Sequence, residues 1–454
     1  MTTNSIETSQ PPVQEVAKRA RASSRSLARL SNEHRNEILM AAASALESGA
    51  QKILNGNERD CRAAQLAVEA GKMSAAMFAR LRVKAKGIEE MAARVRDVAR
   101  LPDPLGRRLA ATELDDGLVL HKESCPLGVV GIVFESRPDV IPQVASLALK
   151  SGNALILKGG AEAAHTSEAL VEVWRGCLEQ FSSVQAHSVQ LLHTRADVME
   201  LLTLDREVDL IIPRGSREFV EFVAKNSRVP VLGHGEGICH VYVDRAADVE
   251  KAIKITLDSK TQYPAACNAA ETLLVHQDIA LRFLPAVVTE LRAAAVEIRG
   301  CSRTVELVRR SDITPAEGAD WATEHSDLVL SVRTVSDIDE AIAHIHRYGS
   351  RHTETIVTED GEAAKKFLEE VDAAGVFHNA STRFADGFRY GLGAELGIST
   401  GKLHARGPVG LEGLTTYKYK LFGNGQIVAE YANGTRQFKH RAIEPPDGPS
   451  TSDL

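Results

Sequence analysis

From Leu127 onward, short apolar runs alternate with longer stretches in which apolar residues recur at helical spacing. The runs GVVGIVF, ALILK, VQLL and DLIIP form a first series. A second series begins near Val249 and includes ETLLVH, DLVLSV and ETIVTED. Strands that alternate with helices are typical of parallel βαβ units, whose strands are buried on both faces. We therefore predict an α/β fold with two Rossmann-like lobes.

Other segments flank these lobes. Residues 13–100 read as consecutive amphipathic helices, and the prolines of LPDPLG end that helical run. The next stretch, ATELDDGLVLHKESCP, carries an Asp116-Gly117 hairpin signal between alternating strands. We expect a small β element here. The termini are polar, so we predict a disordered leader over residues 1–12 and a flexible tail over residues 440–454.

The charge balance limits the possible partners. The 454 residues include 54 basic and 61 acidic side chains, a net charge of −7, which argues against a nucleic-acid-binding surface. We find no apolar run near the roughly 18 residues that span a bilayer and no export signal at the N-terminus. The cysteines show no metal-site spacing, so we expect no metal, no membrane contact and a cytoplasmic location. They are Cys61, Cys125, Cys177, Cys239, Cys267 and Cys301.

Several long segments resemble one family. PLGVVGIVFESRPDV, GNALILKGG and IIPRGS resemble the cofactor-binding half of the aldehyde dehydrogenase superfamily, and QYPAACNAAETLLVH is similar to its nucleophile segment. HNASTRFADGFRYGLGAELGISTGKLHARGPVGLEGLTTYKY closely matches the γ-glutamyl phosphate reductase branch. The resemblance implies NADPH-dependent reduction of L-glutamate 5-phosphate to L-glutamate 5-semialdehyde and phosphate, in proline biosynthesis. The product would cyclise to 1-pyrroline-5-carboxylate.

The resemblance also divides the chain by role. It implies an NADPH-binding domain over residues 13–112 and 126–250 and a catalytic domain over residues 251–400. Residues 113–125 and 401–430 resemble the superfamily's oligomerisation arm. We therefore expect an aldehyde-dehydrogenase-like fold with a small β oligomerisation element, and a homo-oligomer. A glutamate 5-kinase is a possible partner, because it would supply the labile acyl phosphate.

The resemblance makes Cys267 the nucleophile. Acyl-phosphate reduction needs a group that displaces phosphate, and a thiolate does so while leaving a thioester that accepts hydride. Small residues surround Cys267 in AACNAAE. The backbone N–H of Cys267 and the side chain of Asn268 are candidates for holding an oxyanion. Taken alone, Cys267 could equally be a structural thiol and Asn268 a turn former.

Two departures from the superfamily bear on the substrate. Where typical members carry an asparagine, this chain has Glu135-Ser136-Arg137. Arg137 offers a planar fork suited to a carboxylate or phosphate, although a salt bridge to a neighbouring helix is the alternative. The general base of the hydrolytic members has no counterpart in register, since Glu236 is displaced. A thioester that is resolved by hydride needs no such base.

The cofactor residues follow from the resemblance, because the chain shows no GxGxxG fingerprint between a strand and a helix. Lys158 would face the adenosine ribose, and a cation without an adjacent acid tolerates a 2′-phosphate, which favours NADPH. A solvated lysine at a strand end and an ordinary glycine loop are the alternatives. The predicted cofactor contacts are Lys158, Gly159, Gly160, Gly215, Ser216, Gly235 and Glu324, the last at the nicotinamide ribose.

The segment NASTRFADG supplies the remaining substrate candidates. Asn379, Ser381, Thr382 and Arg383 follow an apolar strand in a polar loop, where binding residues usually lie on an α/β scaffold. Arg383 would pair with the α-carboxylate, and Asp386 with the α-ammonium. A loop held by its own side-chain hydrogen bonds explains the same residues.

Two other functions stay open. One is a different semialdehyde dehydrogenase of the same superfamily, which would oxidise its aldehyde to an acid. The other is a superfamily member that serves as a scaffold without catalysis.

Overall fold

The computed structural model describes residues 11–135, 137–233, 235–308 and 313–443. Most of the predicted leader and residues 444–454 of the predicted tail therefore lie outside the described residues, as does Ser136. The chain forms two compact units. The first comprises residues 1–215, 222–232 and 410–454, and the second comprises residues 216–221 and 233–409.

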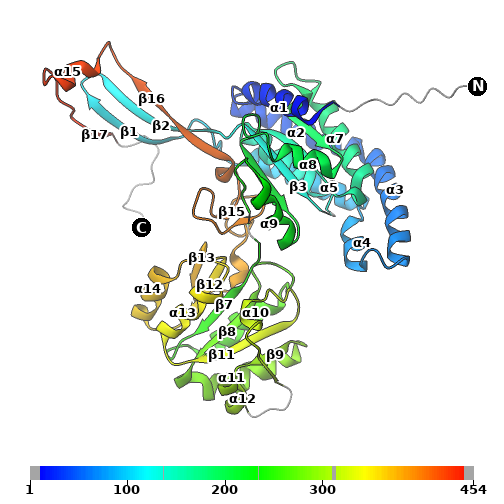
Figure 1. Cartoon of the computed structure of the whole chain (residues 1–454), viewed down its shortest axis with the longest axis vertical. Helices are drawn as coiled ribbons and strands as arrows, with labels where there is room; N and C mark the ends of the chain where they lie inside the picture. The colour runs from blue at the N-terminus through cyan, green and yellow to red at the C-terminus, as the bar shows by residue number, and fades with distance from the viewer. Residues whose placement is uncertain (1–10, 136, 234, 309–312, 444–454) are drawn as a thin grey trace, which may run out of the picture. The chain divides into compact units, whose positions relative to one another are not determined.

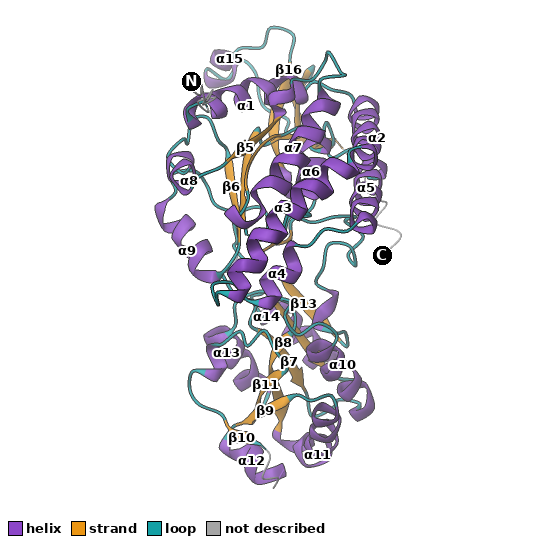
Figure 2. Ribbon diagram, turned by 90° about the vertical axis from the view of Figure 1, so that its right-hand side faces the viewer, coloured by secondary structure: helices purple, strands orange, loops and turns teal. Residues whose placement is uncertain are grey.

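The first unit contains a parallel sheet of order β5-β4-β3-β6 beneath a layer of helices. Figure 2 shows α2, α3, α5, α6 and α7 packed beside one another over these strands. The strands are β3 (Val129–Phe134), β4 (Ala154–Lys158), β5 (Val189–Leu192) and β6 (Leu210–Arg214). The helices are α1 (Val13–Leu27), α2 (Asn32–Ser48), α3 (Ala50–Glu69), α4 (Ala75–Leu81), α5 (Ala85–Arg100), α6 (Val140–Lys150), α7 (Ala164–Leu178), α8 (Arg195–Leu201) and α9 (Arg217–Asn226), which crosses the unit boundary.

The same unit carries an antiparallel ribbon of order β16-β2-β1-β17. Figure 1 shows it projecting beyond the helical layer of its unit, with α15 (Val428–Ala432) near the tip. The predicted hairpin joins β1 (Arg108–Asp115) to β2 (Leu118–Pro126), and Gly117 takes a φ of +68° at the turn. β16 (Thr415–Phe422) pairs with β2. The predicted tail begins too early, because β17 (Arg441–Ile443) bonds to the free edge of β1.

The second unit is built on a parallel sheet of order β10-β9-β11-β8-β7-β12-β13. Two apolar cores lie on its faces: α10 and α11 cover one, and α13 and α14 cover the other. The strands are β7 (Cys239–Val243), β8 (Ala270–His276), β9 (Glu297–Gly300), β10 (Thr314–Pro315), β11 (Val329–Val335), β12 (Thr353–Val357) and β13 (Gly375–His378). The helices are α10 (Val249–Thr261), α11 (Gln277–Ala293), α12 (Ser302–Val308), α13 (Ile338–Tyr348) and α14 (Gly361–Glu370). A two-stranded sheet joins β14 (Ile398–Ser399) to β15 (Gly407–Pro408).

Acidic side chains cap three of the described helices that cover this sheet. Asp248, Asp337 and Asp360 precede α10, α13 and α14, and each accepts backbone N–H groups of the first helical turn. These bonds satisfy amide groups that have no partner within the helix, and they place negative charge at the positive end of its dipole. These caps follow β7, β11 and β12 within a few residues, so each helix begins near the carboxyl end of the preceding strand, as in βαβ units.

The predicted α/β fold with two lobes and a small β element is confirmed by this architecture. Within the residues expected to bind the cofactor, residues 233–250 belong to the second unit. Among the described helices, none combines the length and the apolar character that crossing a bilayer requires.

Candidate active site

Cys267 lies at the amino edge of the sheet in the second unit. β8, β7 and β12 are neighbours and run parallel, so the segments that lead into them meet at one edge. Cys267 precedes β8, Cys239 begins β7, and His352 directly precedes β12. Three segments that are distant in sequence thus converge around one half-buried thiol.

Gly237 allows the closest of these approaches. A Cβ on Gly237 would lie 1.8 Å from the carbonyl oxygen of Cys267 and 2.6 Å from its Cα. Only glycine fits there, because both neighbouring atoms belong to the backbone. The Cys239 thiol donates to the same carbonyl oxygen at 3.3 Å. The segment that leads into β7 therefore fixes the main chain of Cys267.

His352 contacts the candidate nucleophile directly. Its Nε2 lies 3.2 Å from Sγ of Cys267, and its Nδ1 lies 2.8 Å from the Thr353 hydroxyl and 3.7 Å from Sγ of Cys239. Arg351, just before it, takes a φ of +61°. Such backbone conformations outside glycine cost about 1–3 kcal/mol and cluster at functional sites. The sequence did not reveal His352, which is 85 residues from Cys267 in a segment without a motif.

Buried charges lie behind the thiol. Lys260 and Glu271 form a fully buried ion pair at 2.8 Å, and Ser326 donates its N–H to the same carboxylate. Burial raises the pKa of Glu271 to about 7, although the Lys260 ammonium opposes the rise. Burial also raises the pKa of Glu324, whose carboxylate accepts the N–H of Gly237. Glu324, expected at the nicotinamide ribose, therefore lies beside the residue that touches Cys267.

Asn268 is used differently from the expectation. Its amide donates to the carbonyl oxygen of Ala385 at 2.8 Å, and the side chain is buried. This bond joins the nucleophile segment to the loop after β13. The side chain thus holds two loops together. Because its amide already donates to Ala385, this bond does not support the predicted role as oxyanion donor.

Arg383 is a buried predicted substrate residue that contacts the segment leading to Cys267. Its guanidinium is buried, and it interacts electrostatically with Cys267. Its Nε donates to Gln262 at 2.9 Å, and its guanidinium carbon lies 5.9 Å from the centroid of the Tyr263 ring. Burial lowers the pKa of Arg383, but a guanidinium stays charged at neutral pH. The remaining N–H groups suit a carboxylate.

The other residues of this loop hold its shape. The Asn379 amide bonds to the backbone of Thr358 at the carboxyl edge of the sheet, opposite Cys267. The Ser381 hydroxyl contacts the Ser259 hydroxyl at 3.1 Å, and Thr382 is fully buried. Asp386 accepts N–H groups from Phe388 and Arg389. Asp386 thus stabilises the loop from within, whereas Asn379 and Ser381 bond it to Thr358 and Ser259 outside the loop.

Of the predicted cofactor residues, Lys158, Gly159, Gly160 and Gly215 belong to the first unit, whereas Ser216, Gly235 and Glu324 belong to the second. Lys158 ends β4 and Gly215 follows β6, and both strands flank β3, so the two residues lie at the carboxyl edge of that sheet. The chain runs from β3 through β4 to β5 on one side and returns with β6 on the other. Such a change of direction opens a crevice in which α/β proteins bind nucleotides. Ser216 accepts the N–H of Phe219 at the start of α9.

An acid lies against the glycine turn after β4, because a Cβ on Gly160 would lie 2.0 Å from Oε1 of Glu162. Gly159 packs against Phe134 and Ser167, and Gly235 is exposed ahead of Gly237. Arg137 is exposed in the first unit and lies 3.6 Å from Asp139, so a local ion pair is present.

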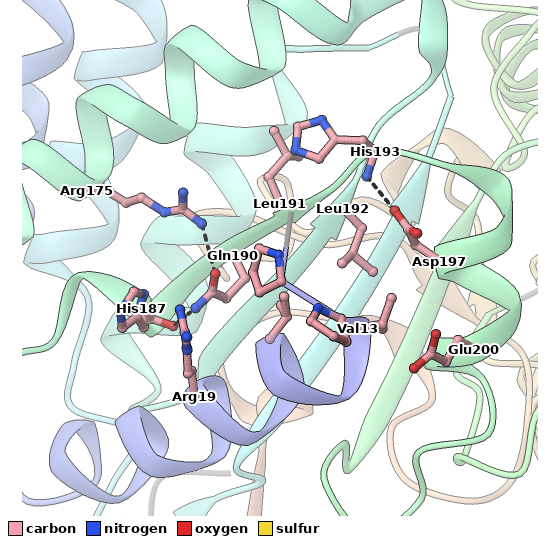
Figure 3. Close-up of a pocket in the computed structure, with 13 residues that line it drawn as sticks. Val13, Arg19, Arg175, His187, Gln190, Leu191, Leu192, His193, Asp197 and Glu200 are labelled. Atoms are coloured by element: carbon pink, nitrogen blue, oxygen red, sulfur yellow. Dashed lines mark hydrogen bonds between the residues drawn. The ribbon is translucent and has the colours of Figure 1, made fainter. Parts of the chain in front are cut away.

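A pocket of about 460 Å³ lies elsewhere in the first unit, among α1, β5 and α8. Figure 3 shows Arg175 bonded to Gln190 on one wall and Asp197 bonded to the backbone of His193 on another. None of the predicted site residues is among those that line it. Within the described part of the chain, no three His, Cys, Asp or Glu side chains are placed to hold a metal.

The close approach at Gly237 can be tested by adding a methyl group. We expect Gly237→Ala to displace the main chain of Cys267, because the new Cβ would overlap its carbonyl carbon and oxygen. A misplacement of about 1 Å can lower a rate about 100-fold. Turnover and the rate of Cys267 alkylation by iodoacetamide both measure the effect.

Gly176→Ala is the matched control, since a Cβ at this position in α7 would meet no atom within 4 Å. It should retain the turnover and alkylation rate of the unchanged protein. A Gly237→Ala protein that also retained both would contradict the packing described here.

Known proteins share this arrangement of elements. A family model described as the aldehyde dehydrogenase family matches residues 3–303. A γ-glutamyl phosphate reductase from Synechococcus sp. (strain JA-3-3Ab) is 56% identical over 423 residues, which cover 93% of this chain and 92% of that one. The same enzyme from Nostoc sp. (strain PCC 7120 / SAG 25.82 / UTEX 2576) is 50% identical over 442 residues, 97% of this chain and 100% of that one.

Solved structures agree with the sequence relatives. The crystal structure of γ-glutamyl phosphate reductase from Thermotoga maritima superposes with a TM-score of 0.89 at 41% identity, covering 92% of this chain and 100% of that one. A glyceraldehyde-3-phosphate dehydrogenase from Methanocaldococcus jannaschii, complexed with NADP, has a TM-score of 0.63 at 17% identity and covers 91% and 96%. That second likeness concerns the fold alone. The chain belongs to the aldehyde dehydrogenase family, in its γ-glutamyl phosphate reductase branch.

Proposed function

We propose that this protein reduces L-glutamate 5-phosphate to L-glutamate 5-semialdehyde and phosphate through a thioester on Cys267, with NADPH as reductant. The observation that carries the proposal is the half-buried Cys267 thiol, which lies against an imidazole and close to a buried arginine. The names of the relatives point to the same reaction. The reaction belongs to proline biosynthesis, and a cytoplasmic location is part of the proposal.

Arg383 gives the site its substrate class. A buried guanidinium near the thiol would bind the α-carboxylate of the glutamyl group and place its γ-carbonyl carbon at Sγ. Asn379, Ser381 and Thr382 support this arginine by holding the loop. Asn268 also holds this loop, because its amide donates to the carbonyl oxygen of Ala385. The oxyanion would then rely on the backbone N–H of Cys267.

The cofactor would lie across the carboxyl edge of the first unit's sheet. Lys158 would meet the adenosine ribose or its 2′-phosphate, and the amides near Gly159, Gly160 and Gly215 at the ends of β4 and β6 would meet the pyrophosphate. NADPH would supply the hydride, and the family resemblance is what assigns Glu324 and Gly235 of the second unit to the cofactor. Arg137, in the same unit, remains a candidate for the substrate phosphate.

The antiparallel ribbon is proposed as a self-association surface. Tyr417, Tyr419, Leu421 and Phe422 of the edge strand β16 are each about half exposed. Apolar side chains on an unpaired edge favour pairing with another chain. We expect a homo-oligomer at micromolar concentration, and a monomer in light scattering would contradict this assignment. Association with a glutamate 5-kinase is a further part of the proposal, testable by co-purification.

The reverse reaction separates the proposal from hydrolytic alternatives. With 1-pyrroline-5-carboxylate and NADP, we expect steady-state NADPH formation only when phosphate is present, because phosphate must release the acyl group from Cys267. The absorbance of NADPH follows the rate. Equal rates without phosphate would favour a semialdehyde dehydrogenase that uses water, and a folded Cys267→Ser protein with full activity would exclude the thioester.

The same assay tests Arg383. Truncating one partner of a buried charge pair costs about 2–5 kcal/mol, so Arg383→Met should lower kcat/KM for pyrroline-5-carboxylate by a corresponding factor. Pentanal serves as the matched substrate, because it has no carboxylate. With pentanal, the decrease in kcat/KM caused by Arg383→Met should be much smaller. Equal losses for both substrates would argue against carboxylate binding.

Cofactor choice is tested at Lys158. We expect Lys158→Ala to weaken use of NADPH by about 1.5–3 kcal/mol, the usual contribution of a charge-assisted hydrogen bond, and to affect NADH little. Kinetics with both cofactors measure the difference. Glu162→Gln is the companion variant, because its carboxylate opposes a 2′-phosphate and its loss should favour NADPH. If Lys158→Ala lowered kcat/KM equally for NADPH and NADH, the assignment of Lys158 to the 2′-phosphate would be contradicted.

A further inference from the structure

We infer that His352 is the catalytic base that takes the proton of Cys267, with Thr353 and Cys239 as residues that position its ring. The nature of the substrate rests on the proposed function, but formation of the thiolate does not. The basis is the 3.2 Å contact between Nε2 of His352 and Sγ of Cys267. His352 is almost fully buried and sits in a segment that the sequence did not single out.

The contacts of the ring permit the tautomer that a base at Nε2 requires. Nδ1 lies 2.8 Å from the Thr353 hydroxyl, which can accept its hydrogen. Burial and the nearby Glu354 keep the Cys239 thiol protonated, because they raise its pKa well above the ordinary value. Cys239 donates its hydrogen to the Cys267 carbonyl at 3.3 Å. With the hydrogen on Nδ1, Nε2 presents a lone pair to the Cys267 thiol.

The backbone holds the imidazole in place. The Ser350 hydroxyl accepts the N–H of Ile238 at 2.8 Å, so the loop before His352 is tied to the segment between Gly237 and Cys239. Arg351 takes a left-handed conformation in the next position. The ring therefore has a defined position before any ligand binds, as a catalytic base requires.

Charged groups approach the pair from several elements. Arg383, from the loop after β13, interacts electrostatically with Cys267 and favours the thiolate. Lys260 of α10 and Glu271 of β8 form their own pair and act on Cys239. Glu354 of β12 is bonded to His240 and acts on Cys239. Glu324 accepts the N–H of Gly237, next to the main chain of Cys267.

The proton and the electron pairs balance through one cycle. His352 takes the proton of Cys267, and the thiolate pair forms the C–S bond to the acyl carbon. The C–O bond to phosphate breaks with its pair on phosphate, which then takes the proton from His352. NADPH, when bound, would supply the hydride that forms the C–H bond, and the C–S bond would break to return its electron pair to sulfur. A proton from water restores the thiol, so the net reaction consumes NADPH and one proton.

The test measures the thiolate without any substrate. The rate of iodoacetamide alkylation of Cys267 is followed against pH, with Cys267→Ser protein subtracted for the other cysteines. We expect alkylation of the unchanged protein to persist well below the ordinary thiol pKa of about 8.5. His352→Gln should slow it about 10-fold or more near pH 7 and move the midpoint toward 8.5. His378→Gln, at the opposite edge of the sheet beside Thr358, is the matched control and should keep the original profile.

Turnover supplies the second readout. Loss of a general base lowers rates by about 10²–10⁴-fold, and the loss in His352→Gln should shrink as pH rises. A His352→Gln protein with the unchanged alkylation profile would overturn the inference. If that variant does not fold, Thr353→Val decides: a smaller shift of the midpoint to higher pH supports the inference, and an unchanged midpoint overturns it.

The two proposals fail in different ways. Alkylation that depends on His352 without turnover of pyrroline-5-carboxylate would retain the base and reject the proposed substrate. Phosphate-dependent turnover, with an alkylation profile that is the same in His352→Gln, would retain the proposed substrate and reject His352 as the base.

Discussion

The close approach of the backbone at Gly237 to the backbone of Cys267 is the constraint on which the centre depends. A side chain at Gly237 would overlap the carbonyl of Cys267, so the segment before β7 and the segment before β8 can meet only through glycine. That contact brings Cys239 under the Cys267 carbonyl and Ile238 against Ser350. His352 then falls beside the sulfur. The absence of a side chain at Gly237 thus allows three segments that are distant in sequence to meet.

The same edge sets the electrostatics. A positive guanidinium lies on the side of the thiol, and the buried acids are each paired, Glu271 with Lys260 and Glu354 with His240. Buried charges are costly unless they are paired, so these contacts stabilise the two acids in the interior. A thioester that is resolved by hydride would need no activating glutamate, which agrees with the displacement of Glu236 in the sequence.

Local periodicity predicted the elements well. Apolar runs of four to seven residues became buried parallel strands, and the Asp116-Gly117 signal became the turn between β1 and β2. The nucleophile was found through its sequence context. His352 was not, because its contact with Cys267 spans 85 residues and depends on the order of β8, β7 and β12 in the sheet. In the loop after β13, the sequence predicted Asn379 and Arg383 as substrate residues together, whereas the structure places Asn379 at the carboxyl edge of the sheet and Arg383 against Gln262. The tail prediction failed at Arg441 because composition does not report the free edge of β1.

The central claim is an acyl-enzyme on Cys267, and peptide mass spectrometry addresses it most directly. The protein is mixed with 1-pyrroline-5-carboxylate and NADP without phosphate, quenched in acid and digested. We predict a γ-glutamyl adduct on the peptide that contains Cys267, and its loss when phosphate is added before the quench. An adduct on another cysteine, or none on any peptide while NADPH is formed, would contradict the account.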